Sequence, residues 1–467
     1  MMSHQQRTLE ALCQRYQIAI LEQTAQKIKI AMAETPSAQV LEALRFASQL
    51  DVECEQWPAA RLEQHLSAHE REQDASQTLK RDISQESAIE RVEQLLATAV
   101  QKRASDIHIE PQLHGLRIRL RIDGVLQILP APRELSPAAM IARLKILANL
   151  DVAERRIPQD GQFTHPIAGN AESFRLSTLP IRFGEKAVIR VLQNESQPLE
   201  LDTLGMSSAA LSRYRQALAR PQGLILVTGP TGSGKTFTLY SGLNALNQPG
   251  RNLSSVEDPI EIPLAGVNQT QINLKTGLDF HLVLRALLRQ DPDVIMLGEI
   301  RDGETAEIAV KAAQTGHLVL STLHTNSTCE TITRLSQMGI PGYLLGSALK
   351  LVIAQRLVRR LCPRCRQPAT AVAHIPSALW PGTLQTWRAA GCHHCFSGYY
   401  GRLALFELLP INAKLQNAIA NHSPVEMLTE LAKQQGMNSL FVEGLHAVSR
   451  GETTLEEVNR VVGLVDD

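Results

Sequence analysis

One short glycine-rich stretch constrains the fold of this chain more than any other. It occupies residues 229–236 and reads Gly-Pro-Thr-Gly-Ser-Gly-Lys-Thr, which fits the pattern G-x-x-x-x-G-K-[ST]. The preceding residues, 224–227, are a continuous apolar run of the kind expected for a buried parallel strand. The following residues, 237–246, carry apolar side chains at helical spacing. A strand, a glycine loop and a helix in this order predict a phosphate-binding loop in an α/β sheet.

The residue types in this loop suit phosphate chemistry. Glycines let the backbone curl so that its N–H groups point at phosphate oxygens, and the helix N-terminus adds a partial positive charge. Lys235 can reach the β- and γ-phosphates, and the Thr236 hydroxyl can ligate Mg²⁺. The alternative, a glycine-rich turn that matches by chance, is disfavoured by the correct flanks. The predicted nucleotide-binding residues are Gly229, Pro230, Thr231, Gly232, Ser233, Gly234, Lys235 and Thr236.

Carboxylates follow two other predicted strands of the same region. Residues 252–256 lead into Glu257-Asp258-Pro259-Ile260-Glu261, which places three carboxylates within five residues. Such a cluster beside a phosphate loop is typical of Mg²⁺ organisation and water activation, whereas Asp-Pro turn chemistry is the structural alternative. Residues 293–297 end in Gly298-Glu299, where the second acidic strand of such folds usually carries Asp. Glu299 alone is therefore expected to act there on metal or water.

A third apolar run, residues 318–323, is flanked by histidines. It ends in His324-Thr325-Asn326. If this strand belongs to the sheet of the phosphate loop, His324 is a candidate sensor of the γ-phosphate. The alternative is a histidine that only packs.

Arginines recur on the strands that precede the phosphate loop. Residues 105–110, 116–124, 173–178 and 187–192 alternate polar and apolar side chains, as half-exposed strands do. Asp123-Gly124 is a hairpin-turn signal, and residues 137–150 are predicted to be helical. The polar face of these strands is either a solvated sheet surface or a basic surface turned toward a phosphate-bearing neighbour. The arginines in question are Arg117, Arg119, Arg121, Arg175, Arg182 and Arg190.

Four of the seven cysteines form two C-x₂-C pairs, Cys362/Cys365 and Cys392/Cys395. Two thiolate pairs suit tetrahedral Zn²⁺ with no open position, which predicts a structural metal site. The alternatives are four free thiols, or a ligand set in which His393 or His394 replaces a cysteine.

Composition excludes several classes of function. Lys+Arg and Asp+Glu both number 47 among 467 residues, and aromatic residues make up only 4%. These values argue against a dominant nucleic-acid-binding surface. No run approaches the roughly 20 apolar residues of a membrane span, and the first residues lack the apolar core of a secretory signal. A cytoplasmic location is therefore predicted.

These features divide the chain into six predicted segments. Short predicted strands at residues 18–21, 28–32 and 52–54 and helices at residues 8–16 and 40–47 indicate a small α/β docking domain at the start. A polar stretch after it is predicted to be a linker. The segments are residues 1–70 (docking domain), 71–87 (linker), 88–200 (second α/β domain), 201–360 (ATPase domain), 361–402 (tetracysteine module) and 403–467 (helical C-terminal region).

Taken together, the motifs resemble the ATPases that power type II secretion and type IV pilus assembly, over roughly residues 85–460. The resemblance implies a RecA-like P-loop motor domain, preceded by a PAS-like α/β domain and a small N-terminal α/β domain, with a zinc-binding C-terminal subdomain. The matching stretches are residues 103–111, 119–124, 156–161, 229–236, 256–261, 288–294, 298–302 and 316–326, together with the four cysteines and residues 398–402.

The same resemblance implies roles for single residues. Glu257 is expected to activate water, Glu299 to act in a degenerate Walker B strand, and His324 to lie with His317 in a histidine box. Arginines of the second domain are expected to complete the ATP site, and Arg175 and Arg190 are the predicted ones. With Lys235, these residues make up the predicted catalytic set.

The resemblance also implies cofactors and partners. ATP, Mg²⁺ and a structural Zn²⁺ are expected, in a homo-hexamer that works with a platform or docking protein of the inner membrane. No specific nucleic acid is expected. The alternatives are a nucleic-acid-binding P-loop motor, a pilus-retraction ATPase, and a ring that binds nucleotide without hydrolysing it.

Overall fold

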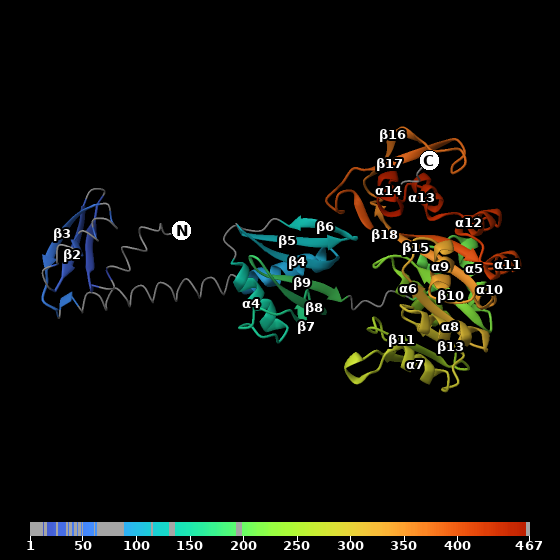
Figure 1. Cartoon of the computed structure of the whole chain (residues 1–467). Helices are drawn as coiled ribbons and strands as arrows, with labels where there is room; N and C mark the ends of the chain where they lie inside the picture. The colour runs from blue at the N-terminus through green and yellow to red at the C-terminus, as the bar shows by residue number, and fades with distance from the viewer. Residues whose placement is uncertain are drawn as a thin grey trace.

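The computed structural model describes residues 88–113, 115–129, 136–192 and 199–463, together with separate parts of residues 13–62. The predicted linker, residues 71–87, lies outside the described residues, and so does most of the helix predicted before residue 17. The described elements fall into three units along the chain, coloured blue, cyan to green, and green to red in Figure 1. No described helix has the length and hydropathy of a membrane span.

The first unit contains a three-stranded sheet in the order β1-β2-β3. Its strands are β1 (Ala19–Gln23), β2 (Lys27–Met32) and β3 (Asp51–Gln56). The buried side chains of Ile28 and Ile30 form its small core together with Leu44. The strands predicted from residues 18–21, 28–32 and 52–54 are thus confirmed, whereas the second predicted helix, residues 40–47, is described only in part.

The second unit is a six-stranded antiparallel sheet in the order β6-β5-β4-β9-β8-β7. A helix at residues 88–101 and α4 bury apolar side chains in the same core as the strands. Helix α4 ends at Leu147, three residues earlier than the predicted Leu150. The elements are β4 (Ala104–Gln112), β5 (Gly115–Ile122), β6 (Val125–Leu129), α4 (Pro137–Leu147), β7 (Gln159–Ile167), β8 (Asn170–Ile181) and β9 (Gly184–Leu192).

The third unit begins at a short 3-10 helix, η1, and runs to the end of the described chain. Its first half alternates strands and helices. The elements are η1 (Leu201–Leu204), α5 (Ser208–Leu218), β10 (Gly223–Thr228), α6 (Lys235–Leu246), β11 (Leu253–Glu257), β12 (Asn268–Gln271), η2 (Leu274–Thr276), α7 (Phe280–Leu287), β13 (Val294–Leu297), α8 (Gly303–Gln314), β14 (Leu318–Leu323), α9 (Thr328–Gln337) and α10 (Gly342–Ala348).

Its second half contains long strands followed by short helices. The elements are β15 (Leu349–Leu361), β16 (Arg366–His374), β17 (Thr383–Ala389), β18 (Tyr399–Pro410), α11 (Ala413–Ala420), α12 (Val425–Gln434), α13 (Leu440–Ser449) and α14 (Leu455–Val462).

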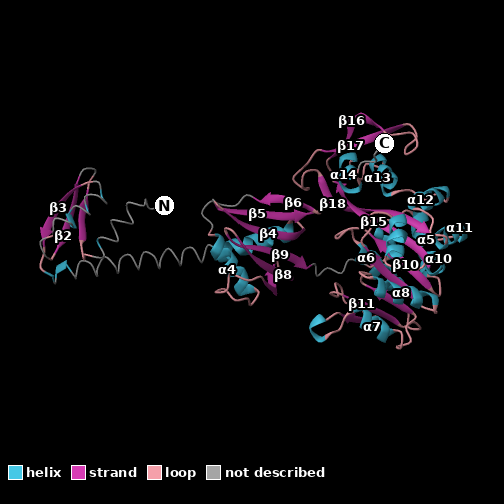
Figure 2. Cartoon of the chain, viewed as in Figure 1, coloured by secondary structure: helices cyan, strands magenta, loops and turns pink. Residues whose placement is uncertain are grey.

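A seven-stranded sheet in the order β12-β11-β13-β14-β10-β15-β18 organises this third unit. Successive residues of β10 enter opposite cores: Leu224 and Leu226 pack with α7 to α12, whereas Ile225 and Val227 pack with α5 and α6. Figure 2 shows the magenta strands between cyan helices. Burial on both faces is the property of parallel sheets that produces continuous apolar runs, as in residues 224–227.

The direction of the strands brings the predicted site segments to one edge of this sheet. Strands β10, β11, β13 and β14 are parallel to their neighbours, so their carboxyl ends lie together. The phosphate loop follows β10, Glu257 ends β11, Glu299 follows β13 and His324 follows β14. This edge is where ligands bind in open α/β sheets.

The predicted boundaries after residue 360 differ from the observed ones. Residues 403–410, predicted as part of a helical region, belong to β18, which pairs antiparallel with β15. Helices α11 and α12 then pack in the same core as the parallel strands. The four cysteines and the β16–β17 hairpin are therefore an insertion between two adjacent strands of the seven-stranded sheet, because β15 ends at Leu361 and β18 begins at Tyr399. A mixture of charged and apolar residues hid the edge strand from periodicity analysis.

The second unit contacts the cysteine module of the same chain through a hairpin turn and through residues just before β4. The Asp123-Gly124 turn was predicted from sequence, and both residues have the positive φ angles, 49° and 86°, that a type I′ turn requires. Asp123 Oδ2 accepts a hydrogen bond from the Gly401 N–H at 3.0 Å. The Arg103 guanidinium lies 3.8 Å from the ring centre of Tyr400. We call these four contacting residues, Arg103, Asp123, Tyr400 and Gly401, the hairpin latch.

A buried carboxylate connects the last helix to the seven-stranded sheet. Glu457 of α14 accepts from Arg359 Nη2 of β15 at 2.8 Å and from Arg460 Nε at 2.8 Å. Burial alone would raise the pKa of the Glu457 carboxyl, but these arginines lower it to about 2. Because this pKa is depressed by folding, the stabilisation is complete above the ordinary glutamate pKa and is lost as the pH falls toward 2.

We therefore expect Glu457→Gln to lower the free energy of unfolding of the motor unit by about 2–3 kcal/mol at pH 7, since charged hydrogen bonds are lost in a buried site. Denaturant titration measures this difference, and it should shrink below about pH 4. Glu456→Gln, an exposed change on the same helix, serves as the control. Equal stability of Glu457→Gln and the control would show that the buried pair contributes nothing.

Candidate functional site

The phosphate loop connects β10 to α6 through three glycines with positive φ. These angles are 149° at Gly229, 79° at Gly232 and 87° at Gly234, and only glycine adopts them without strain. A Cβ on Gly229 would lie 2.5 Å from the Gln355 carbonyl oxygen, so the loop also approaches β15 too closely for any side chain. Thr236 is exposed in the first turn of α6, which leaves its hydroxyl free to bind a metal.

Lys235 is a buried cation at the centre of this loop. Its Nζ donates to the carbonyl oxygens of Gly229 at 2.8 Å and Pro230 at 3.1 Å. Burial lowers the pKa of its amine to about 8; the positive charge of Arg356 contributes to this lowering, and Glu299 opposes it. The site thus holds a positive charge that burial disfavours, and an anion would stabilise it.

Glu299 is the carboxylate whose negative charge acts on Lys235. Arg301 donates to its Oε1, and His324 Nε2 lies 3.3 Å from its Oε2. Burial would raise the pKa of the Glu299 carboxyl, but Arg301 and His324 together hold it below its usual range. Arg301 also lies 3.6 Å from Asp258 Oδ2, which links Glu299 to the acidic segment. The structure therefore brings together Glu299 and His324, which the sequence singled out separately as site residues.

Glu257 is enclosed rather than open to the loop. Its carboxylate accepts hydrogen bonds from the Tyr240 hydroxyl of α6, from Ser255 Oγ at 2.5 Å and from Gln269 Nε2 at 3.1 Å. Its side chain is 3% exposed. In this conformation Glu257 holds α6 against β11 and β12, and a water molecule would reach it only after these bonds open.

Glu261, the last carboxylate of the acidic segment, has the opposite environment. It is exposed, and its backbone N–H donates to the Tyr240 hydroxyl at 3.3 Å. Tyr240 therefore fixes Glu257 with its hydroxyl hydrogen and holds the backbone of Glu261 with its oxygen. Sequence patterns do not separate these two glutamates, because one ends β11 and the other lies four residues after it.

His317 lies at the far end of β14 from His324. Its Nδ1 is 3.0 Å from the Ala312 carbonyl oxygen at the end of α8. The six residues of β14 separate the two histidines, a distance of about 20 Å along the strand. His317 thus terminates a helix, and only His324 reaches the phosphate edge.

Most arginines of the second unit have carboxylate partners of their own. Arg117, Arg119 and Lys186 surround Glu110, at 2.9, 2.7 and 3.1 Å. Burial would raise the pKa of the Glu110 carboxyl, but hydrogen bonds from these cations lower it to about 2. One carboxylate is thus shared by three cations, which holds their side chains within the sheet face but offsets only one of the three positive charges.

Arg175 and Arg190 are the more available arginines. They are register partners on β8 and β9, and both are exposed. Arg190 shares Asp106 with Arg121, at 3.2 and 3.5 Å. No ion pair in the described parts of the chain includes Arg175, and none connects either arginine to the phosphate loop of its own chain. Within one chain the structure does not bring them to the site.

The four predicted metal ligands converge. The sulfur atoms of Cys362, Cys365, Cys392 and Cys395 all lie within 4.8 Å of one another. The individual separations are 4.0 Å for Cys362–Cys392, 3.6 Å for Cys365–Cys395 and 3.6 Å for Cys392–Cys395. A tetrahedral zinc with bonds of about 2.3 Å requires sulfur separations of about 3.8 Å, whereas a disulfide requires about 2.05 Å. This arrangement can bind a zinc ion.

Sequence analysis missed two functional candidates next to the loop. Gln355 Oε1 accepts from Thr238 Oγ1 at 2.7 Å, and its neighbour Arg356 is 7% exposed beside Gly229. Both lie in β15, between the apolar residues 351–354 and 357–358. A polar pair inside an apolar run was the available signal, because buried charges need a specific reason.

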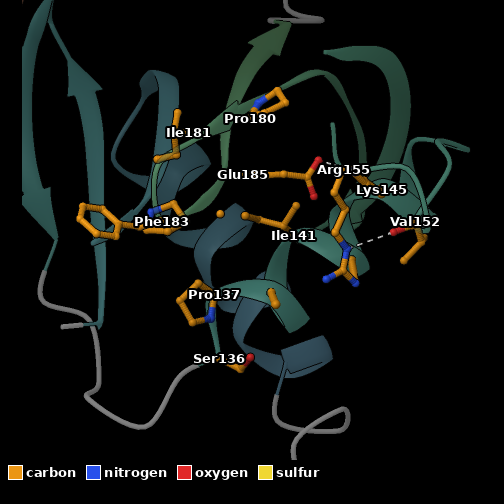
Figure 3. A pocket seen from close by; sticks show the side chains of 14 residues that line it. Ser136, Pro137, Ile141, Lys145, Val152, Arg155, Pro180, Ile181, Phe183 and Glu185 are labelled. Atoms are coloured by element: carbon orange, nitrogen blue, oxygen red, sulfur yellow. Dashed lines mark hydrogen bonds and ion pairs between the residues drawn. The ribbon is translucent and has the colours of Figure 1, made fainter. Parts of the chain in front are cut away.

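The described chain also has a hollow of about 380 Å³, which lies in the second unit. Figure 3 shows it between α4 and the β8–β9 turn, with Lys145 and Glu185 on its wall and Phe183 at its side. Lys145 Nζ lies 2.5 Å from Glu185 Oε1 and donates to the Glu154 carbonyl oxygen at 2.7 Å. None of the predicted site residues lines this hollow.

Known proteins share both the sequence and the fold of this chain. Residues 82–460 match the family described as Type II/IV secretion system protein. A protein transport protein HofB homolog of Escherichia coli (strain K12) is 55% identical, covering 98% of each chain. A type IV pilus assembly ATPase PilB of Acinetobacter baylyi is 39% identical over 97% of this chain and 83% of its own length. The crystal structure of the pilus retraction motor PilT with bound ADP superposes with a TM-score of 0.54 at 28% identity, covering 80% of this chain and 97% of that one.

Proposed function

Because this chain belongs to the type II/IV secretion system protein family, we propose that it is the ATPase that drives assembly of a type IV pilus or a type II pseudopilus fibre. One observation carries the proposal most directly. A buried lysine lies in a loop of phosphate-binding geometry, and the Glu299 carboxylate, held by arginine and histidine, lies at the same edge of the sheet after β13, two strands from β10. Similarity to a pilus assembly ATPase and to a motor solved with ADP supports the same chemistry.

Each residue of the site has a distinct role in this proposal. The loop N–H groups and Lys235 bind the β- and γ-phosphates, and Thr236 binds Mg²⁺, which neutralises charge as the γ-phosphoryl group is transferred to water. Glu299 orients the water or the metal, and His324 reports on the γ-phosphate through its contact with Glu299. Glu257 activates water once the Tyr240 bond opens, or Glu261 does so from its exposed position.

We further propose a ring of six chains in which the second unit of one chain serves the site of another. The absence of a link within one chain, among the described residues, from Arg175 and Arg190 to the phosphate loop supports action between chains. The ring would work in the cytoplasm against a platform or docking protein of the inner membrane. Hydrolysis would then move the second unit relative to the motor unit.

Two competing functions have less support. A pilus-retraction motor shares the fold, but the tetracysteine insertion and the N-terminal unit favour the assembly class. A nucleic-acid-binding motor is disfavoured by the equal numbers of acidic and basic residues. Steeply salt-dependent binding to DNA would favour that second reading.

Lys235→Ala tests the nucleotide site. We expect it to abolish ATP turnover, because it removes the buried cation that binds the β- and γ-phosphates. Turnover and oligomeric mass are measured on the same full-length samples, so that a lost ring is not mistaken for a lost site. Lys311→Ala, an exposed change on α8, is the matched control. Full turnover in Lys235→Ala would refute the proposed function.

The three glutamates can be ranked by single amide substitutions. Glu299→Gln should retain ATP binding and lower turnover by about 10²-fold or more, the size of a general base or electrostatic contribution. Glu257→Gln and Glu261→Gln distinguish the two carboxylates of the acidic segment under the same conditions. A loss in Glu257→Gln alone assigns water activation to the enclosed glutamate, and a loss in Glu261→Gln alone assigns it to the exposed one. Undiminished turnover in all three would contradict the mechanism.

We propose that the four cysteines bind one structural zinc per chain. Metal analysis of the purified protein should find about one zinc, and Cys392→Ser should lower both the zinc content and the melting temperature. Cys54→Ser, at an exposed cysteine outside the cluster, is the control. A stably folded protein without zinc, with Cys392→Ser equal to the control, would show that the cluster is four free thiols.

A further inference from the structure

Three cations are buried in the described chain: Lys145, Lys235 and Arg356. Lys145 has a carboxylate partner, Glu185, at 2.5 Å. No ion pair within 4 Å includes Lys235 or Arg356 in the described ranges, and both lie at the phosphate loop. A buried charge without a counter-charge is costly, so such a pair of cations marks a place where a bound anion supplies the missing charge.

Arg356 lies between the two segments that surround the nucleotide phosphates. Its Nη1 is 3.2 Å from the position of a Cβ on Gly229 and donates to the Gln355 carbonyl oxygen at 3.1 Å. Its Nη2 donates to both the carbonyl oxygen and the Oδ1 of Asn326, each at 3.2 Å. One guanidinium therefore holds the strand end after His324 next to the first glycine of the phosphate loop.

The surroundings of Arg356 are neutral at contact distance. Burial holds the pKa of its guanidinium below the usual range, and the negative charges of Glu407 and Glu330 oppose this only from a distance. Those two carboxylates are engaged elsewhere: Glu407 accepts from Thr328 Oγ1 at 2.6 Å, and Glu330 accepts from the Asn326 N–H at 3.0 Å.

Arg359, three residues along β15, shows what a compensated arginine looks like in this strand. It donates to Glu457 Oε2 at 2.8 Å. The strand thus carries a paired arginine far from the loop and an unpaired one beside it. Packing alone does not explain the difference, because a residue that only fills space would not need a charge that must be desolvated.

We propose that Arg356 is a positioning residue of the ATP site, with the nucleotide phosphates as its counter-charge and Asn326 as the group that it positions. This rests on the proposed function and extends it. Because ATP carries more negative charge than ADP, the guanidinium favours the triphosphate. It thereby couples the γ-phosphate to the segment after His324, which Arg356 holds through two hydrogen bonds.

The test compares MgATP and MgADP binding to the full-length chain by titration calorimetry. Arg356→Gln should weaken MgATP binding by about tenfold or more, the loss expected for a charged contact, and MgADP binding by clearly less. Arg356→Lys, which keeps the charge, should recover part of the preference for MgATP. The control is Arg359→Gln, which removes an arginine of the same strand that is already paired with a carboxylate. It should leave the ratio of the MgATP and MgADP affinities unchanged.

The melting temperature without nucleotide separates this role from a structural one. Arg356→Gln removes an uncompensated buried charge, so the melting temperature without nucleotide should be unchanged or higher. The rise in melting temperature that MgATP produces should become smaller in this variant. A lower melting temperature without nucleotide, an equal loss for both nucleotides, or unaltered binding would each overturn the proposal. Lys235→Ala in the same series separates the proposed function from the proposed role of Arg356. Normal MgATP binding by Lys235→Ala would refute the proposed function. Loss of binding in Lys235→Ala with normal binding in Arg356→Gln would refute only the role of Arg356.

Discussion

The burial of β10 on both faces determines where the chemistry of this protein takes place. Each of its central side chains, 224–227, is fully buried, and a buried aliphatic side chain contributes about 1.5–3 kcal/mol to folding. This packing fixes the end of β10 between β14 and β15. The loop that follows must then turn within a confined space, where Gly229 has no room for a side chain. The precision of the phosphate site is therefore a consequence of the sheet rather than of the loop alone.

Local sequence patterns predicted the parts of the site that depend on local structure. The strand, glycine turn and helix at residues 223–246 and the Asp123-Gly124 turn each follow from residue types at fixed spacing, and these conformations are confirmed. The convergence of the four cysteines was also predictable, because metal ligands in C-x₂-C pairs must meet to be useful. Glu299 and His324 met because parallel strands end at a common edge.

Other features depend on contacts between residues distant in sequence. Glu257 is enclosed by Tyr240 and Gln269, and no pattern around Glu257 itself reveals that environment. His317 and His324 look alike in sequence, yet a six-residue strand places them at opposite edges of the sheet. Arg356 likewise lacks an ion-pair partner in the described chain because the nearest carboxylates bond to other groups. Sequence patterns identify which groups are present, whereas tertiary packing decides which groups are free.

The paired strands β15 and β18 form a ribbon that could act as a lever between the phosphate loop and the cysteine module. From Arg356 beside the phosphate loop to Leu361 before the first cysteine, the ribbon extends about 17 Å at the usual rise of 3.3 Å per residue. A rotation of about 0.2 radian at the loop would move the far end by about 3 Å in a rigid ribbon of this length. At that end the cysteine module connects the two strands. The hairpin latch, through the hydrogen bond to Asp123, then connects the module to the second unit. A metal ion held by the four cysteines would stiffen this junction, so that a displacement at the phosphate loop would reach the second unit with less bending of the ribbon.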